Sequence, residues 1–108
     1  MLTVNRILIL IAVDILGDNS HGNHVGNLIV NTTGKHETLR RGVYVTLHAM
    51  RDRGWLDQWI AGDKTPRPFY SLTKLGREVL DAQLKEFRDI VAVWDKAQAR
   101  RLRKEIAA

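Results

Sequence analysis

The stretch that decides the fold runs from Thr38 to Leu80 and reads TLRRGVYVTLHAMRDRGWLDQWIAGDKTPRPFYSLTKLGREVL. Its first part repeats apolar residues at spacings of four, four and three, the period of one buried helix face: Leu39, Val43, Leu47 and Met50. The spacing predicts a helix that begins near Thr38 and includes Gly42. We expect this helix to end at Gly54, in the left-handed conformation that glycine favours after a helix.

Two short aromatic-rich runs follow, and they are typical of the strands of a hairpin. They cover residues 55–60 and 68–72, and the loop of residues 61–67 between them is too long for a two-residue turn. Thr73 then caps a helix that we expect to continue to about residue 104. The order of helix, hairpin and long helix predicts a winged helix-turn-helix. That is a mainly α fold (α+β) with a two-stranded β wing and a long C-terminal helix.

Upstream of this stretch, residues 2–16 are mostly apolar and predict a largely buried first helix. A turn at residues 17–20 precedes a second helix expected over residues 21–32, with Ser20 as its N-cap. The apolar run from Ile7 to Val13 is too short to cross a bilayer, and Asp14 follows it at once. We therefore expect no membrane partner.

The chain has 108 residues, enough for one domain, and a formal net charge of +5. The charge is uneven: residues 1–34 carry one basic and two acidic side chains, whereas residues 35–70 carry seven basic and four acidic ones. Residues 71–108 carry nine and six. This distribution favours a polyanionic partner, although a modest basic excess is also common on ordinary soluble surfaces. The absence of cysteine excludes disulfides and thiolate chemistry and fits a cytoplasmic protein.

The last helix carries an apolar seam at alternating steps of four and three residues: Leu80, Leu84, Phe87, Val91 and Trp94. Such spacing over about two heptads is typical of a helix that packs along another helix. A second copy of the chain is the simplest partner. We therefore expect residues 1–72 to form a winged-helix DNA-binding region and residues 73–108 a dimerisation helix, within one structural domain.

Three motifs together resemble the PadR family of bacterial transcription regulators. They are His21-Gly22 at the start of the second helix, Tyr44 followed by Leu47, Met50 and Gly54, and the run Phe69-Tyr70-Ser71-Leu72-Thr73-Lys74-Leu75-Gly76-Arg77. The resemblance covers most of the chain and fits the compact branch with a single C-terminal helix. It implies a homodimeric regulator of transcription, most simply a repressor, that binds double-stranded DNA at a pseudo-palindromic operator.

The chain departs from the family pattern at three places. Asn23 stands where an aromatic residue usually follows the His-Gly pair, and Leu39-Arg40-Arg41 replaces the small or hydroxyl residues that usually begin the recognition helix. The wing offers only Lys64 and Arg67 where the family has several basic residues. These departures bear on the affinity for DNA and on the operator that is preferred.

The candidate DNA-binding residues lie at the expected start of the third helix and in the hairpin loop: Lys35, Thr38, Arg40, Arg41, Tyr44, Lys64 and Arg67. Arginine can donate two hydrogen bonds to guanine in the major groove, whereas threonine, tyrosine and lysine suit phosphates. The alternative is a solvated basic face and an ordinary charged loop. The basic residues near the C-terminus, from Arg100 to Lys104, fit a solvated helix end.

The apolar seam also allows two readings that do not exclude each other. One is packing at a dimer interface, and the other, implied by the resemblance, is a flat aromatic effector stacked on Phe87 between the subunits. Neither a metal site nor a cofactor is expected, since the four histidines have no further ligand at a recognisable spacing. No arrangement of catalytic residues is present, so we do not expect an enzyme. The alternatives to a transcription regulator are a protein–protein adaptor and an accessory DNA-binding protein of a mobile element.

Overall fold

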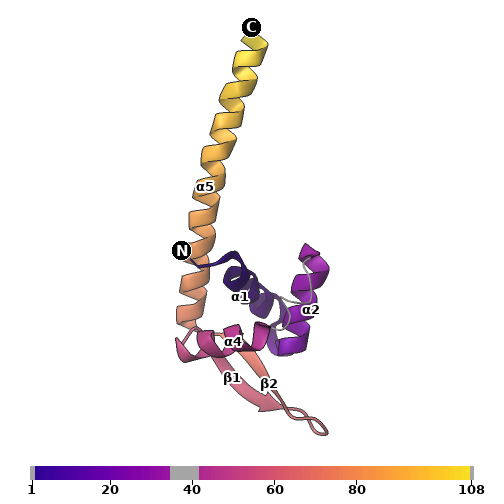
Figure 1. Ribbon diagram of the computed structural model, residues 1–108. Helices are drawn as coiled ribbons and strands as arrows, with labels where there is room; N and C mark the ends of the chain where they lie inside the picture. The colour runs from indigo at the N-terminus through magenta and orange to yellow at the C-terminus, as the bar shows by residue number, and fades with distance from the viewer. Residues whose placement is uncertain (1, 35–41, 108) are drawn as a thin grey trace.

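The computed structural model describes residues 2–34 and 42–107. The elements form a small helical body, a two-stranded wing and one long helix that leaves the body (Figure 1). In chain order they are α1 (Val4–Leu16), the 3-10 turn η1 (Gly17–Asn19), α2 (Gly22–Thr33), α4 (Val43–Asp52), β1 (Leu56–Ala61), β2 (Arg67–Leu72) and α5 (Lys74–Ala107). This is the predicted winged helix-turn-helix.

The turn between α1 and α2 differs in one detail from the prediction. The N-cap of α2 is His21 and not Ser20. The Ser20 hydroxyl is buried and donates to the carbonyl oxygens of Val13 at 2.9 Å and Gly17 at 2.7 Å. These two carbonyls also accept backbone amides, so the Ser20 hydroxyl adds a second donor and joins the end of α1 to the turn η1.

Helix α4 begins later than the apolar spacing indicated. Gly42 occupies the N-cap position of this helix, so its prediction as an interior residue was wrong. The predicted start near Thr38 lies outside the described residues. At the other end the prediction is confirmed, because Gly54 follows the helix with a φ of +79°. That conformation is strained for residues with a Cβ atom, and it turns the chain into the wing.

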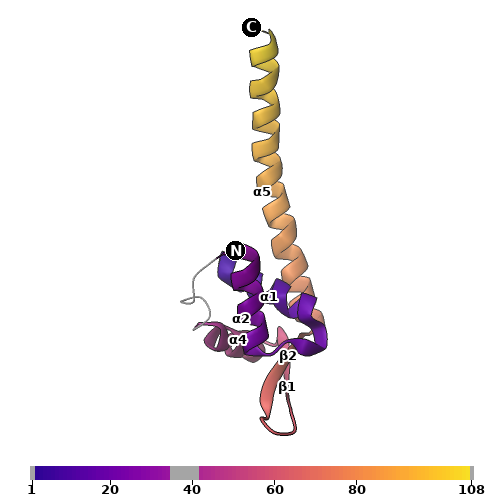
Figure 2. The same cartoon turned by 90° about the vertical axis from the view of Figure 1, so that its right-hand side faces the viewer.

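Strands β1 and β2 pair in antiparallel register, from Leu56 opposite Leu72 to Ala61 opposite Arg67. Trp59 and Phe69 face each other across the pair with their rings stacked at a centroid distance of 5.8 Å. Such an aromatic pair stabilises a hairpin that has no other strand beside it. The wing projects from the end of the body where α4 lies, opposite the C-terminal end of α5 (Figures 1 and 2).

Helix α5 starts at a compact junction with the wing. The Thr73 amide donates to the Trp55 carbonyl at 3.0 Å, and the Thr73 hydroxyl donates to the Gly54 carbonyl at 2.6 Å. The same hydroxyl accepts from the amide of Gly76 at 3.0 Å, which confirms Thr73 as the helix cap. Over its 34 residues α5 extends about 50 Å, so its second half lies beyond the body (Figure 2).

The core joins α1, α2, α4, the wing and the first turns of α5. Its fully buried members are Ile7, Ile9, Leu10, Ala12, Val13, Val25, Ile29, Val43, Leu47, Met50, Leu56, Tyr70 and Leu80. The membership of Leu80 corrects the predicted seam: this side chain is 2% exposed within its own chain, so it cannot present a surface to a partner. Within the described residues, no helix is long and apolar enough to cross a membrane.

Candidate nucleic-acid interface

Helix α4 has one buried face and one outer face. Val43, Leu47 and Met50 point into the core, as their spacing predicted. On the opposite side, Val45 and His48 are exposed. The described part of α4 carries no basic residue before Arg51. The outer surface of the first turns of α4 therefore presents the apolar Val45 beside the polar His48. Neither residue was among the candidates predicted from the sequence.

The predicted DNA-binding residues fall into two groups. Lys35, Thr38, Arg40 and Arg41 lie outside the described residues, so the structure does not place them. Tyr44 lies in the first turn of α4, and Lys64 and Arg67 lie exposed in the wing loop and at the start of β2. Lys64 and Arg67 therefore lie on the wing and not on α4. The wing and α4 are at the same end of the molecule (Figure 1).

Tyr44 has a packing role that sequence reasoning missed. Its ring lies against Gly22 at the start of α2, where a Cβ atom would stand 2.8 Å from the Tyr44 hydroxyl and closer still to the ring. The Tyr44 residue remains 39% exposed. The contact explains why a glycine is needed beside His21, and it fixes the position of α4 against α2.

Three contacts hold the wing to the helices. The Tyr70 amide donates to the Ser20 carbonyl at 2.9 Å, and an isolated antiparallel bridge joins His21 to Phe69. On the other side, the Arg51 guanidinium of α4 donates to the Gln58 side-chain oxygen of β1 at 2.5 Å. These contacts therefore hold the wing against α4 and against the chain just before α2.

Two buried groups at these contacts have shifted pKa values. Burial is the main cause that lowers the pKa of His21, and the neighbouring His24 and Arg67 lower it further. The ring of His21 lies 3.7 Å from that of His24 and edge-on to Phe69 at 5.3 Å. Burial also raises the pKa of Tyr70, whose hydroxyl has no hydrogen-bond partner among the described residues. Both groups are therefore neutral near pH 7.

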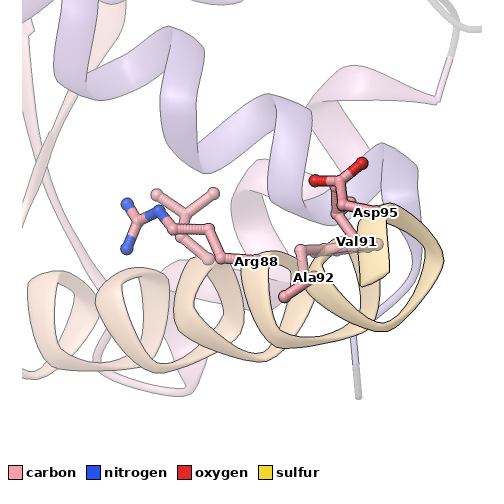
Figure 3. A pocket seen from close by; sticks show the side chains of 6 residues that line it. Arg88, Val91, Ala92 and Asp95 are labelled. Atoms are coloured by element: carbon pink, nitrogen blue, oxygen red, sulfur yellow. The ribbon is translucent and has the colours of Figure 1, made fainter. Parts of the chain in front are cut away.

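Helix α5 carries the remaining residues of the predicted seam. Leu84 and Phe87 are half-buried against the core, whereas Val91 and Trp94 are exposed. An open hollow of about 410 Å³ lies beside them, lined by Leu84, Phe87, Arg88, Val91, Ala92 and Asp95. Figure 3 shows Arg88, Val91, Ala92 and Asp95 around this hollow on one side of the helix. Further along, the Arg101 guanidinium lies 5.7 Å from the Trp94 ring centre.

A second apolar depression lies between α1 and α2. It has a volume of about 250 Å³ and is lined by Leu8, Ile11, Ala12, Ile15, Leu28, Ile29 and Thr32. Ile15 is exposed at its edge. We refer to this depression as the α1/α2 groove. The described residues contain no cluster of three or more side chains suited to a metal ion.

Several solved structures share this fold. A PadR family transcription regulator of hypervirulent Clostridium difficile R20291 superposes with a TM-score of 0.75 at 18% identity, over 87% of this chain and 97% of the other. For a regulator of Clostridium thermocellum the TM-score is 0.65, at 21% identity, over 86% and 90% of the two chains. A protein of Thermoplasma acidophilum, provisionally assigned as a transcriptional regulator, gives 0.69 at 19% identity, over 86% and 91%.

These similarities confirm the predicted resemblance at the level of the fold. No protein-family model matches the chain, and no curated protein matches it in sequence. The alignments include at least 90% of each of these three chains and at least 86% of this one. The similarity therefore extends over the body, the wing and the long helix together.

Proposed function

We propose that the protein is a sequence-specific DNA-binding regulator of transcription that acts as a homodimer. The observation that carries this proposal is the position of α4 and the wing at one end of the molecule, with Lys64 and Arg67 exposed on the wing. In a winged helix, such a helix enters the major groove while the wing reaches the adjacent backbone. Residues 1–72 would then bind DNA, and residues 73–108 would join the two subunits.

The charge distribution supports a nucleic acid as the partner. Residues 35–70 carry seven basic and four acidic side chains. Three of the seven precede α4 in sequence: Lys35, Arg40 and Arg41. The two arginines suit guanine or phosphate, and Lys35 and Thr38 suit phosphates. Tyr44 packs against Gly22 and is partly exposed, so its hydroxyl is available to a phosphate.

The dimer would join two surfaces that a single chain leaves uncovered. The second half of α5 exposes Val91 and Trp94, and the α1/α2 groove exposes the apolar edge of the body. If α5 of each subunit packs along the partner's α5 and α1, both surfaces become buried, with two-fold symmetry. Two recognition helices would then face half-sites about 34–36 Å apart on one duplex.

Repression is the simplest action for such a protein. A regulator that occupies an operator acts most directly by excluding polymerase from the promoter. A cytoplasmic location follows from this function.

Selection from a pool of random duplexes tests the proposal. We expect the purified protein to retain and enrich an inverted repeat, with affinity that falls steeply as salt rises because phosphate contacts release counterions. Retention without enrichment would instead indicate a general DNA-coating protein, such as an accessory factor of a mobile element. No retention at low salt would favour a protein–protein adaptor.

A second proposal concerns an effector, and the hollow beside Phe87 favours it. Its lining combines an aromatic ring, aliphatic side chains and one charge of each sign, which suits a flat aromatic molecule. Because three tryptophans are present, the test uses a variant with Trp55→Phe and Trp59→Phe, so that Trp94 alone reports. Planar compounds should quench its fluorescence, and an unresponsive signal across a varied panel would contradict the proposal.

A further inference from the structure

Val45 is the most unusual residue on the outer face of α4. Its side chain belongs to a residue that is 72% exposed, and no large apolar residue described before α5 is more exposed. It is also β-branched, which lowers its preference for a helix relative to alanine. Neither packing nor helix stability therefore explains a valine at this position.

The position of Val45 is set by the buried residues around it. Val43 and Leu47 point into the core, and Val45 lies midway between them in sequence. Two residues along a helix rotate the side chain by about 200°, so Val45 points directly away from the body. It lies in the first turn of α4, the part of a recognition helix that comes nearest to the base edges.

We propose that Val45 contacts the C5 methyl group of a thymine in the major groove and sets the preference for thymine at that base pair. This inference rests on the proposed DNA-binding function. Of the four bases, only thymine presents a methyl group there. All four bases present hydrogen-bonding groups there, so the preference comes from the methyl group, against which a valine side chain packs and which the other three bases lack.

The surroundings of Val45 favour DNA over a protein partner. The exposed neighbours on its face are polar: His48 one turn later and Asp52 beyond it. A single exposed valine is too small for a protein-docking patch, which usually spans several hundred Å². The cations Lys64 and Arg67 lie at the same end of the molecule, and they complement the phosphates that flank a base pair.

The test removes one methyl group from the DNA and the matching ones from the protein. In the operator obtained by selection, each thymine is replaced in turn by deoxyuridine, which lacks only the C5 methyl. We expect one thymine in each half-site at which wild-type affinity falls about fourfold per contact, as for the loss of one buried methyl group. Other thymines should show smaller changes.

The same duplexes are then measured with Val45→Ala, and with Val93→Ala as the matched control. Val93 is 71% exposed on α5, so its loss removes an equally solvated side chain. Val45→Ala should bind the thymine and deoxyuridine duplexes equally, whereas Val93→Ala should behave as wild type. Alanine favours a helix more than valine, so the Val45 variant should keep its fold.

The outcomes separate the inference from the function on which it rests. If Val45→Ala keeps the full sensitivity to deoxyuridine, that sensitivity arises from DNA shape, and the contact with Val45 is refuted while DNA binding stands. If no thymine responds in the wild-type protein, the contact is refuted as well. If no operator can be selected at all, both the contact and the proposed function fail.

Discussion

The Tyr44 ring of α4 lies directly against the Cα atom of Gly22 at the start of α2, and no side chain fits between them. The contact therefore joins the His21-Gly22 motif to the motif that begins at Tyr44, although the two are far apart in the sequence. The glycine allows the approach, and the aromatic ring fills the space that a side chain at position 22 would take. This contact fixes the position of α4 against α2.

We predict that Gly22→Ala destabilises the protein by about 1 kcal/mol, because the new methyl group displaces the Tyr44 ring. The clash involves the outer atoms of a half-exposed side chain, which can move aside, so unfolding is not expected. In a Tyr44→Ala background the same change should become neutral or stabilising, since alanine suits a helix better than glycine by up to about 1 kcal/mol. Urea denaturation of the four proteins measures this cycle, and additive effects would contradict the contact.

The same substitution at Gly76 should have a larger effect on stability, because the atoms nearest to Gly76 belong to the backbone of Trp55. A Cβ atom at Gly76 would overlap the Trp55 carbonyl oxygen and stand 2.9 Å from the carbonyl carbon. That carbonyl also accepts the Thr73 amide and cannot move without breaking the junction between the wing and α5. We expect Gly76→Ala to cost about 3 kcal/mol or more.

Thermal unfolding checks the prediction for Gly76, with Glu78→Ala as the control. Glu78 is exposed on the same helix, so its replacement should change stability by less than about 0.5 kcal/mol. Equal midpoints for the Gly76 and Glu78 variants would show that the junction is looser than its geometry indicates.

The sequence was sufficient for the elements whose signals are local. The two strands were predicted to within one residue at each end, because aromatic runs flanked by glycine and proline limit where a hairpin can lie. Thr73 was identified as a cap for the same kind of reason. The position of Gly42 was predicted wrongly because the apolar spacing begins before α4 does, and no side-chain cap marks the start of this helix.

The functional residues were harder to predict because their roles depend on contacts distant in sequence. A heptad pattern does not distinguish packing on the chain's own body from packing on a partner. Leu80 therefore appeared in the dimer seam, although α1 lies beside the first turns of α5, as the ion pair between Asp14 of α1 and Arg77 of α5 shows. Val45 was overlooked although the buried face of α4 was predicted correctly, because only side chains that are charged or form hydrogen bonds were taken as candidates for DNA contact.

The shifted pKa of His21 predicts that stability depends on pH. Burial, His24 and Arg67 hold its pKa in the folded protein below the ordinary value of 6.5. As pH falls below 6.5, the His21 side chain binds a proton in the unfolded chain but stays neutral in the folded protein. The free energy of unfolding therefore decreases until the pH reaches the pKa of His21 in the folded protein. Above pH 6.5 this contribution is fully present.

Thermal midpoints measured from pH 8 to pH 5 test this expectation. His21→Asn removes the titrating group but retains a side chain that can cap α2. The variant should lose less stability than the wild type as pH falls through this range. A parallel decline in both proteins would assign the pH dependence to other groups.

The exposed seam of α5 predicts a dimer that one charge can disrupt. We expect Trp94→Asp to yield a monomer at micromolar concentration, since a carboxylate buried at an apolar interface lacks a partner. Val93→Asp is the matched control, because Val93 neighbours Trp94 but lies on another face of the helix. Sedimentation equilibrium distinguishes the two, and a dimer that tolerates Asp at position 94 would place the interface elsewhere.

The arginines that precede α4 predict where DNA binds along the molecule. Changing Arg40 and Arg41 to Ala should weaken operator binding by at least about tenfold, with the dimer intact. The slope of log affinity against log salt should also become shallower, by roughly one for each phosphate contact that is lost.

The control removes the same charge at the far end of α5 by changing Arg100 and Arg103 to Ala. This pair lies opposite the wing, so a shared duplex cannot easily reach both ends (Figure 1). If both double variants weaken binding equally, attraction by net charge explains the affinity; if only the Arg40 and Arg41 variant does, the interface lies beside α4.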